Sequence, residues 1–100
     1  MPSADPLPVN IVHEAHASRF ETLVGGHRCV TEYDLAGTRM TMTHTSVPVA
    51  LRGRGIAAAL VAAALAHARA AGLRVRPDCS YVARYMQRHP ETLDLLEAGD

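Results

Sequence analysis

The sequence predicts an α+β fold in which an antiparallel meander of four strands is followed by a helix, a parallel strand and a second helix. Residues 10–47 alternate between polar and apolar side chains and contain short glycine turns, which is typical of hairpins. Residues 56–71 form an alanine-rich run in which the larger apolar residues recur at helical spacing. Because 100 residues build only a small core, we expect a single domain at 9–100, preceded by a flexible arm at 1–8.

Composition restricts the class of protein. Hydrophobic residues make up 48% of the chain and charged residues 20%, as in folded soluble domains. Ten basic residues balance ten acidic ones, so the zero net charge argues against a nucleic-acid surface. The first residues lack a signal-peptide pattern, and His67 and Arg69 interrupt the most apolar run, so neither export nor membrane insertion is expected. Cys29 and Cys79 are too few for a disulfide scaffold, which favours the cytoplasm.

The predicted meander consists of short strands joined by tight turns. The strands are expected at 10–15, 19–24, 27–35 and 38–47, with turns at Gly25-Gly26 and Ala36-Gly37. Alternate residues of a strand point to the same side, so Met40, Met42 and His44 are expected to share one face of the fourth strand. The connections leave no room for a helix between these strands.

Helices are expected only after the meander. The first helix should end near Ala71, because Gly72 supplies a C-terminal stop. Residues 73–77 then return as a short strand parallel to the fourth, since a helix crosses over between the two. A second helix is expected at 80–89, with Asp78 as a capping or first-turn acid. A helical tail follows, whose Leu93, Leu95 and Leu96 are placed to cap the core.

The loop between the fourth strand and the first helix has the features of an anion site. The first N–H groups of a helix lack intrahelical partners and lie at the positive end of its dipole. In RGRGIA, Gly53 and Gly55 let the backbone approach phosphate oxygens, while Arg52 and Arg54 can add charge-assisted hydrogen bonds.

Two other interpretations of this loop stay open. The loop could be a simple solvated turn. It also matches the dinucleotide pattern G-x-G-x-x-A, with Asp78 about 20 residues further on. The preceding strand disfavours that pattern, because it alternates threonines and contains Pro48, unlike a buried parallel strand. A Walker loop is excluded, because the chain contains no lysine.

The R-x-x-G-x-G/A motif at residues 52–57 resembles the acyl-CoA pyrophosphate loop of the GNAT superfamily of N-acyltransferases. The stretches HTSVPVALRGRGIA, LRVRPDCSYV and YMQRHPE are similar to its compact, single-domain group. The resemblance implies acetyl-CoA as cofactor, a mixed sheet, and backbone groups around Pro48 that pair with pantetheine. The implied cofactor-binding residues are Val47, Val49, Arg52, Gly53, Arg54, Gly55, Ile56 and Ala57. The helices that usually flank the acceptor and the final strand pair have no counterpart, so the acceptor side should be open.

Candidates for the chemistry lie in the fourth strand and the second helix. Cys79 follows a strand and begins a helix, where the dipole favours a thiolate. It could carry the acetyl group, donate a proton to the leaving thiolate, or be a packed thiol. His44 could be a general base or the partner of Cys79, or a packed histidine, and Ser46 stands where the compact group often has an acid. Tyr81 and Tyr85 share a helix face where the wider family places a proton-donating tyrosine; the alternative, which the spacing favours, is packing in the core or against the cofactor.

The predicted function is that of a small N-acetyltransferase that uses acetyl-CoA and an unidentified amine acceptor. The alternative is a CoA-binding or interaction module with little transfer activity. Cys29, in mid-strand, is expected to be structural, and the histidine and cysteine spacings match no zinc pattern. We expect a cytoplasmic, bacterial protein, a monomer or weak dimer, that binds neither nucleic acid nor membranes.

Overall fold

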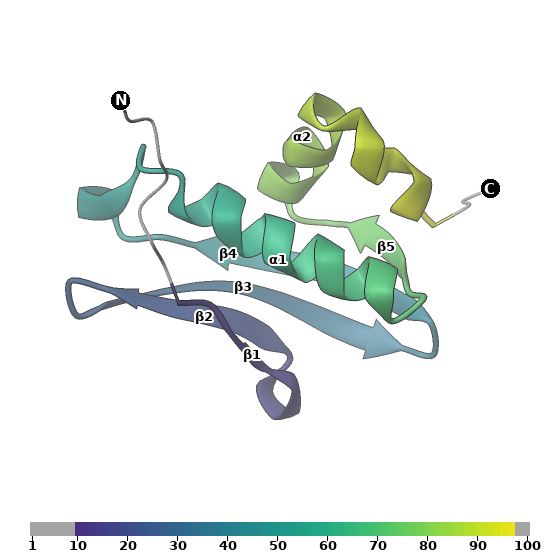
Figure 1. Cartoon of the computed structure of the whole chain (residues 1–100), viewed down its shortest axis with the longest axis horizontal. Coiled ribbons are helices and arrows are strands. Elements are labelled where there is room, and N and C mark those ends of the chain that lie inside the picture. The colour runs from purple at the N-terminus through teal and green to yellow at the C-terminus, as the bar shows by residue number, and fades with distance from the viewer. Residues whose placement is uncertain (1–9, 98–100) are drawn as a thin grey trace.

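The computed structural model describes residues 10–97, which form one five-stranded mixed sheet (Figure 1). Its strand order follows the sequence: β1 (Val12–Glu14), β2 (Arg19–Val24), β3 (His27–Ala36), β4 (Arg39–Ser46) and β5 (Arg74–Pro77). Strands β1 to β4 pair antiparallel, whereas β5 pairs parallel to β4. This confirms the predicted fold class. The predicted arm at 1–8 lies outside the described residues, so the division into arm and domain stays a prediction.

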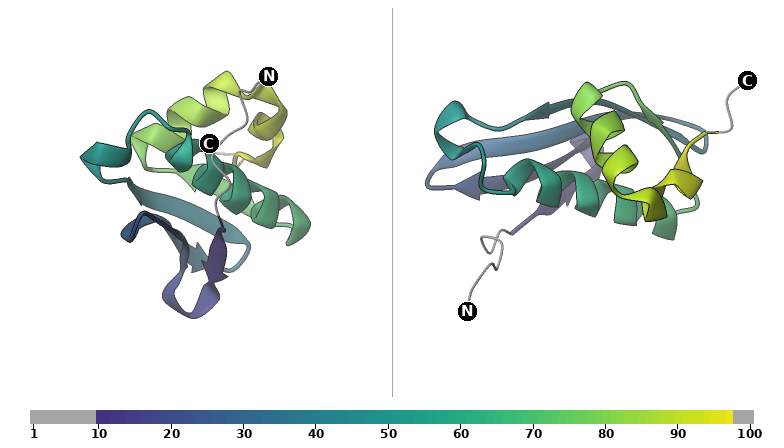
Figure 2. Two further views of the ribbon diagram at one scale, coloured as in Figure 1. Left: turned by 60° about the vertical axis from the view of Figure 1, so that its left-hand side comes forward. Right: turned by 90° about the horizontal axis from the view of Figure 1, so that it is seen from above.

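Two α-helices, α1 (Ile56–Ala70) and α2 (Ser80–Arg88), cover one face of the sheet (Figure 2). The predicted bulky residues of α1 are buried: Ile56, Leu60, Val61 and Leu65. The alanines at 64 and 68 are also fully buried, which lets the helix lie close to the strands. Helix α2 adds Val82 and Met86 to the same core. Neither helix is long and apolar enough to cross a membrane.

Three short 3-10 helices complete the described chain: η1 (Ala15–Ala17), η2 (Val49–Leu51) and η3 (Pro90–Leu95). Turn η1 joins β1 to β2, and η2 ends β4 earlier than predicted. The tail is η3 rather than an α-helix; in it Leu95 is buried as expected, but Leu93 is exposed. Asp78 does not cap α2, because its carboxylate accepts a hydrogen bond from Arg76 Nε at 3.0 Å and Cys79 holds the N-cap position.

A β-bulge in β4 reverses the faces of its second half. Glu32 of β3 pairs with His44 and Tyr33 pairs with Met42, so Thr43 is an extra residue without a partner. Before the bulge, Met40 and Met42 face the helices. After it, positions 45 and 47 take the helix side and His44 is exposed on the outer face, which is the face that α1 and α2 leave uncovered. The expectation that His44 shares a face with Met40 and Met42 is therefore wrong.

Candidate functional site

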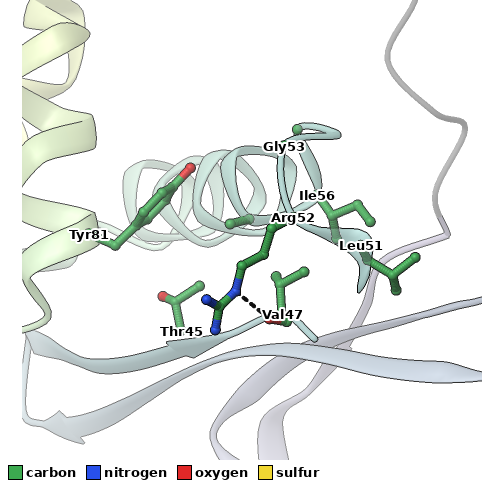
Figure 3. A pocket seen from close by; sticks show the side chains of 9 residues that line it. Thr45, Val47, Leu51, Arg52, Gly53, Ile56 and Tyr81 are labelled. Carbon is green, nitrogen blue, oxygen red and sulfur yellow. Dashed lines mark hydrogen bonds between the residues drawn. The ribbon is translucent and has the colours of Figure 1, made fainter. Parts of the chain in front are cut away.

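A cavity of about 440 Å³ lies at the end of β4, where η2, the following loop, the first turn of α1 and the start of α2 meet (Figure 3). The sequence brings these elements together because β5 stops pairing with β4 at Met42, after which the chain turns into α2. The cavity is lined by Thr45, Val47, Leu51, Arg52, Gly53, Gly55, Ile56, Ala57 and Tyr81. Six of the eight residues predicted to bind the cofactor thus share one cavity.

The loop presents backbone N–H groups at the cavity. Gly53 and Gly55 have φ angles of +83° and +81°, a conformation that L side chains rarely adopt. Gly55 is the N-cap of α1, and the first intrahelical bond runs from Ala59 N to Gly55 O at 3.0 Å. The N–H groups of residues 56–58 therefore have no helical acceptor, and no side chain of residues 10–97 caps this end. This is the backbone arrangement that binds phosphate at helix N-termini.

Arg52 folds back over the strand end. Its Nε donates a hydrogen bond to the Val47 carbonyl at 3.2 Å, and its guanidinium lies between Thr45 and Val47 (Figure 3). The Val49 carbonyl accepts the Arg52 backbone N–H at 3.2 Å, which closes η2. Val49 itself is 75% exposed and does not line the cavity, and neither does the exposed Arg54. The backbone groups around Pro48 were expected to pair with pantetheine. Two of them, the Val47 and Val49 carbonyls, already accept hydrogen bonds from Arg52.

Cys79 lies beside the cavity at the start of α2. Its backbone N–H donates to the Met42 carbonyl at 2.9 Å, which continues the β4–β5 pairing into the helix. Its half-buried thiol donates to Thr45 Oγ1 at 3.7 Å. Cys79 therefore lies against the second half of β4, where it contacts Met42 and Thr45.

The other predicted chemical residues are not all brought to the cavity. His44 lies on the outer face, in a shallow depression with Arg19, Arg28, Val30, Glu32 and Ser46, so the structure does not bring its ring to Cys79. Tyr81 forms a cavity wall and is 39% exposed; burial raises the pKa of its phenol, so the phenol stays protonated at neutral pH. Burial also raises the pKa of Tyr85, but this ring stacks on His89 with centroids 3.9 Å apart, away from the cavity.

Two cavity residues, Thr45 and Leu51, were not predicted from the sequence. Simple alternation from Met40 places Thr45 on the wrong face, because the bulge cannot be read from β4 alone. Leu51 did carry a signal: Val47 and Leu51 are apolar residues four apart across Pro48, a spacing that indicates a helical turn with one buried side. The buried Cys29 packs in the core as expected, and burial raises the pKa of its thiol.

The fold matches that of a known acyltransferase class. The solution structure of a GCN5-like protein from Staphylococcus aureus superposes with a TM-score of 0.65, covers 96% of this chain and 93% of its own, and is 17% identical in sequence. At that identity the likeness shows the fold alone, which is the GNAT fold. The antiparallel β3–β4 pairing sets aside the dinucleotide interpretation, which needs a parallel sheet there.

The sequence comparisons are more specific. Residues 19–95 match the family described as GCN5-related N-acetyl-transferase. Proteins named NATD1 from mouse and human are 34% identical over 86 residues, which cover 83% of this chain and 78% and 76% of theirs. A NATD1 protein from Xenopus tropicalis is 32% identical over 92 residues, which cover 88% of this chain and 84% of its own. The chain belongs to the GCN5-related N-acetyltransferase family. These relatives are vertebrate proteins, so the expectation of a bacterial source finds no support in them.

Proposed function

We propose that the protein binds acetyl-CoA in the cavity at the end of β4 and transfers the acetyl group to an amine. One observation carries this proposal: the uncapped N-terminus of α1, the two positive-φ glycines and Arg52 converge on a single cavity of about 440 Å³. Phosphate oxygens would accept hydrogen bonds from the first N–H groups of α1, and Arg52 would leave the Val47 carbonyl to join them.

The acyl end of the cofactor would then lie between β4 and α2. Pairing between β4 and β5 stops at Met42, so backbone groups of β4 beyond this point are available on that edge. Acetyl-CoA supplies an activated thioester carbonyl. A neutral acceptor amine attacks that carbon, the C–S bond breaks, and the nitrogen releases one proton to water as the amide forms. The departing CoA thiolate takes up one proton. Tyr81 holds a proton at neutral pH on the cavity wall, which suits it to this step.

Cys79 permits a second route to the same products. Its thiolate would attack the thioester carbon, the acetyl group would move to Sγ, and the amine would then displace the thiolate. The thiol lies next to the cavity, because it contacts the hydroxyl of Thr45 and Thr45 lines the cavity. The proton of the thiol would leave to water or to the departing thiolate.

A module that binds CoA without efficient transfer is the alternative. The observation that favours it is the short connection between β1 and β2, where η1 occupies three residues, Ala15–Ala17. Among residues 10–97, no α-helix lies between β1 and β2. Such an open side suits either a large acceptor, whose own surface completes the site, or a docking partner.

Titration calorimetry with CoA and acetyl-CoA tests the shared part of both proposals. The variant Arg52→Ala combined with Arg54→Ala should bind at least about tenfold more weakly, because it loses charge-assisted hydrogen bonds to phosphate. The control Arg28→Ala removes an exposed arginine of the outer face and should bind as the wild type does. No binding by the wild type would overturn both proposals. Turnover of acetyl-CoA with a panel of amines then separates enzyme from binding module.

A further inference from the structure

We infer that the hydroxyls of Thr31 and Thr45 form a relay that positions the Cys79 thiol and donates hydrogen bonds to its thiolate. Thr45 is thus a positioning residue for chemistry at Cys79. The inference rests on the proposed function, because it gives Cys79 a part in acyl transfer, but the relay itself is a property of the protein without substrate.

The relay is a continuous chain of polar contacts that leads from the cavity wall into the core. Cys79 Sγ lies 3.7 Å from Thr45 Oγ1, and Thr45 Oγ1 lies 2.9 Å from Thr31 Oγ1. Thr31 Oγ1 is also 3.4 Å from the His44 carbonyl oxygen. Thr31 is 0% exposed, whereas Thr45 lines the cavity. The chain therefore connects a buried acceptor to a thiol beside the proposed acyl site.

The hydroxyl protons can be arranged in two ways. With a neutral thiol, Cys79 donates to Thr45, Thr45 donates to Thr31, and Thr31 donates to the His44 carbonyl. With a thiolate, Thr45 donates to sulfur and Thr31 donates to Thr45. The change requires only the rotation of two hydroxyl groups. The thiol proton leaves to water or to a base, and the relay itself neither gains nor loses a proton.

The bulge at Thr43 makes this chain possible. Thr31 and Thr45 are paired residues of β3 and β4, and because the bulge absorbs the extra residue Thr43, Thr45 lies on the helix side, where Cys79 begins α2. Paired threonines can stabilise a sheet without any further role. A pair of threonines that only stabilised the sheet would not need the additional contact between the Cys79 thiol and the Thr45 hydroxyl.

A neighbouring threonine provides a matched control. Thr22 lies on β2, is only 2% exposed and has no hydrogen-bond partner for its Oγ1 among the described residues. Thr22→Val therefore makes the same chemical change in the same core without touching the relay. Thr31→Ser keeps the buried hydroxyl, whereas Thr31→Val removes it.

The test is the rate at which iodoacetamide alkylates Cys79 in the folded protein at neutral pH, followed by peptide mass spectrometry. Thr45→Val should slow alkylation about tenfold, because the reacting thiolate loses a charge-assisted donor. Thr31→Val should show a smaller effect in the same direction. Thr31→Ser and Thr22→Val should match the wild type. A wild-type rate of alkylation in Thr45→Val would overturn the relay.

A second readout separates this inference from the proposed function. Alkylation needs no acetyl-CoA, so the relay can be refuted while calorimetry still shows cofactor binding, and the reverse also holds. In the transfer reaction, Thr45→Val should lower kcat by a larger factor than it raises KM, since valine keeps the shape of the cavity wall but loses the hydroxyl that contacts the thiol. An unchanged kcat together with slowed alkylation would overturn the link between the relay and turnover.

Discussion

Replacing Gly55 with alanine tests whether the loop before α1 binds phosphate through its backbone. Gly55 has φ +81°, and a Cβ built on it meets no atom within 4 Å. In the free protein, the substitution therefore lowers the free energy of unfolding only through backbone strain. The bound cofactor should resist it further, because the Cβ would stand where the backbone meets phosphate oxygens.

The two effects have different magnitudes. Alanine in the left-handed region costs about 1–2 kcal/mol, of which about 0.4–1 kcal/mol is offset by a less flexible unfolded chain. The free energy of unfolding should thus fall by about 1 kcal/mol, which lowers Tm by about 4–8 °C in a domain of this size. Losing one hydrogen bond to a charged phosphate should raise Kd for CoA by about ten- to a hundredfold.

Gly26→Ala is the control for strain alone. Gly26 has nearly the same φ, +80°, also with no atom within 4 Å of a Cβ, and lies in the β2–β3 turn away from the cavity. Calorimetry with CoA and thermal unfolding are measured on both variants. Equal losses of stability with a loss of affinity only in Gly55→Ala support the backbone cradle. Wild-type affinity in Gly55→Ala would refute it, and an equal loss of affinity in Gly26→Ala would assign the effect to destabilisation.

Three further predictions concern the core and its titratable groups. Leu60→Ala, at a fully buried position of α1, should lower the free energy of unfolding in urea by about 2–5 kcal/mol, whereas Leu23→Ala, 65% exposed, should cost less than about 1 kcal/mol. Burial and the nearby His67 lower the pKa of His13 from 6.5, so the free energy of unfolding should fall as the pH drops below 6.5; a rise in urea midpoint there would contradict this. Iodoacetamide should modify Cys79 but not the buried Cys29 until the protein is denatured, and equal native rates would contradict the described core.

The sequence was sufficient to predict what depends on local pattern. The Gly25-Gly26 turn, the helix stop at Gly72 and the buried face of α1 follow from spacing and glycine content, and the structure confirms all three. The parallel return of β5 follows from the helix that crosses over the sheet between β4 and β5, and it is confirmed as well. That the loop brings glycines, an arginine and a helix start to one place could also be predicted, because these residues follow one another in the sequence.

What the sequence did not reveal depends on pairing between distant residues. The bulge is a property of the register between β3 and β4, where Glu32 and Tyr33 meet residues that are two positions apart. No pattern within β4 marks Thr43 as the extra residue, since threonines occur at every second position there. Because the prediction missed this one extra residue, it placed His44 in the site and left Thr45 out of it, whereas the structure shows the opposite. Nor did the sequence show that Arg52 binds the Val47 carbonyl.

Deleting Thr43 tests the structural role of the bulge. Because Thr43 has no partner, its removal leaves regular alternation, in which Thr45 and Val47 still face the helices and His44 still faces outward. The fold should therefore persist. The bend that a bulge gives a strand should be lost, together with the hydrogen bond from Thr43 Oγ1 to the Glu32 carbonyl at 3.3 Å.

A straighter β4 would change the cavity, because the bulge follows directly on Met42, where pairing with β5 ends. We expect the deletion to remain folded by circular dichroism but to bind CoA at least about tenfold more weakly. Thr43→Val is the matched control: it keeps the extra residue and the bend, replaces only the hydroxyl by a methyl group, and should bind CoA as the wild type does. Wild-type affinity in the deletion would show that the cavity does not depend on the bend of β4, and unfolding of the deletion would show that the bulge is needed for the sheet itself.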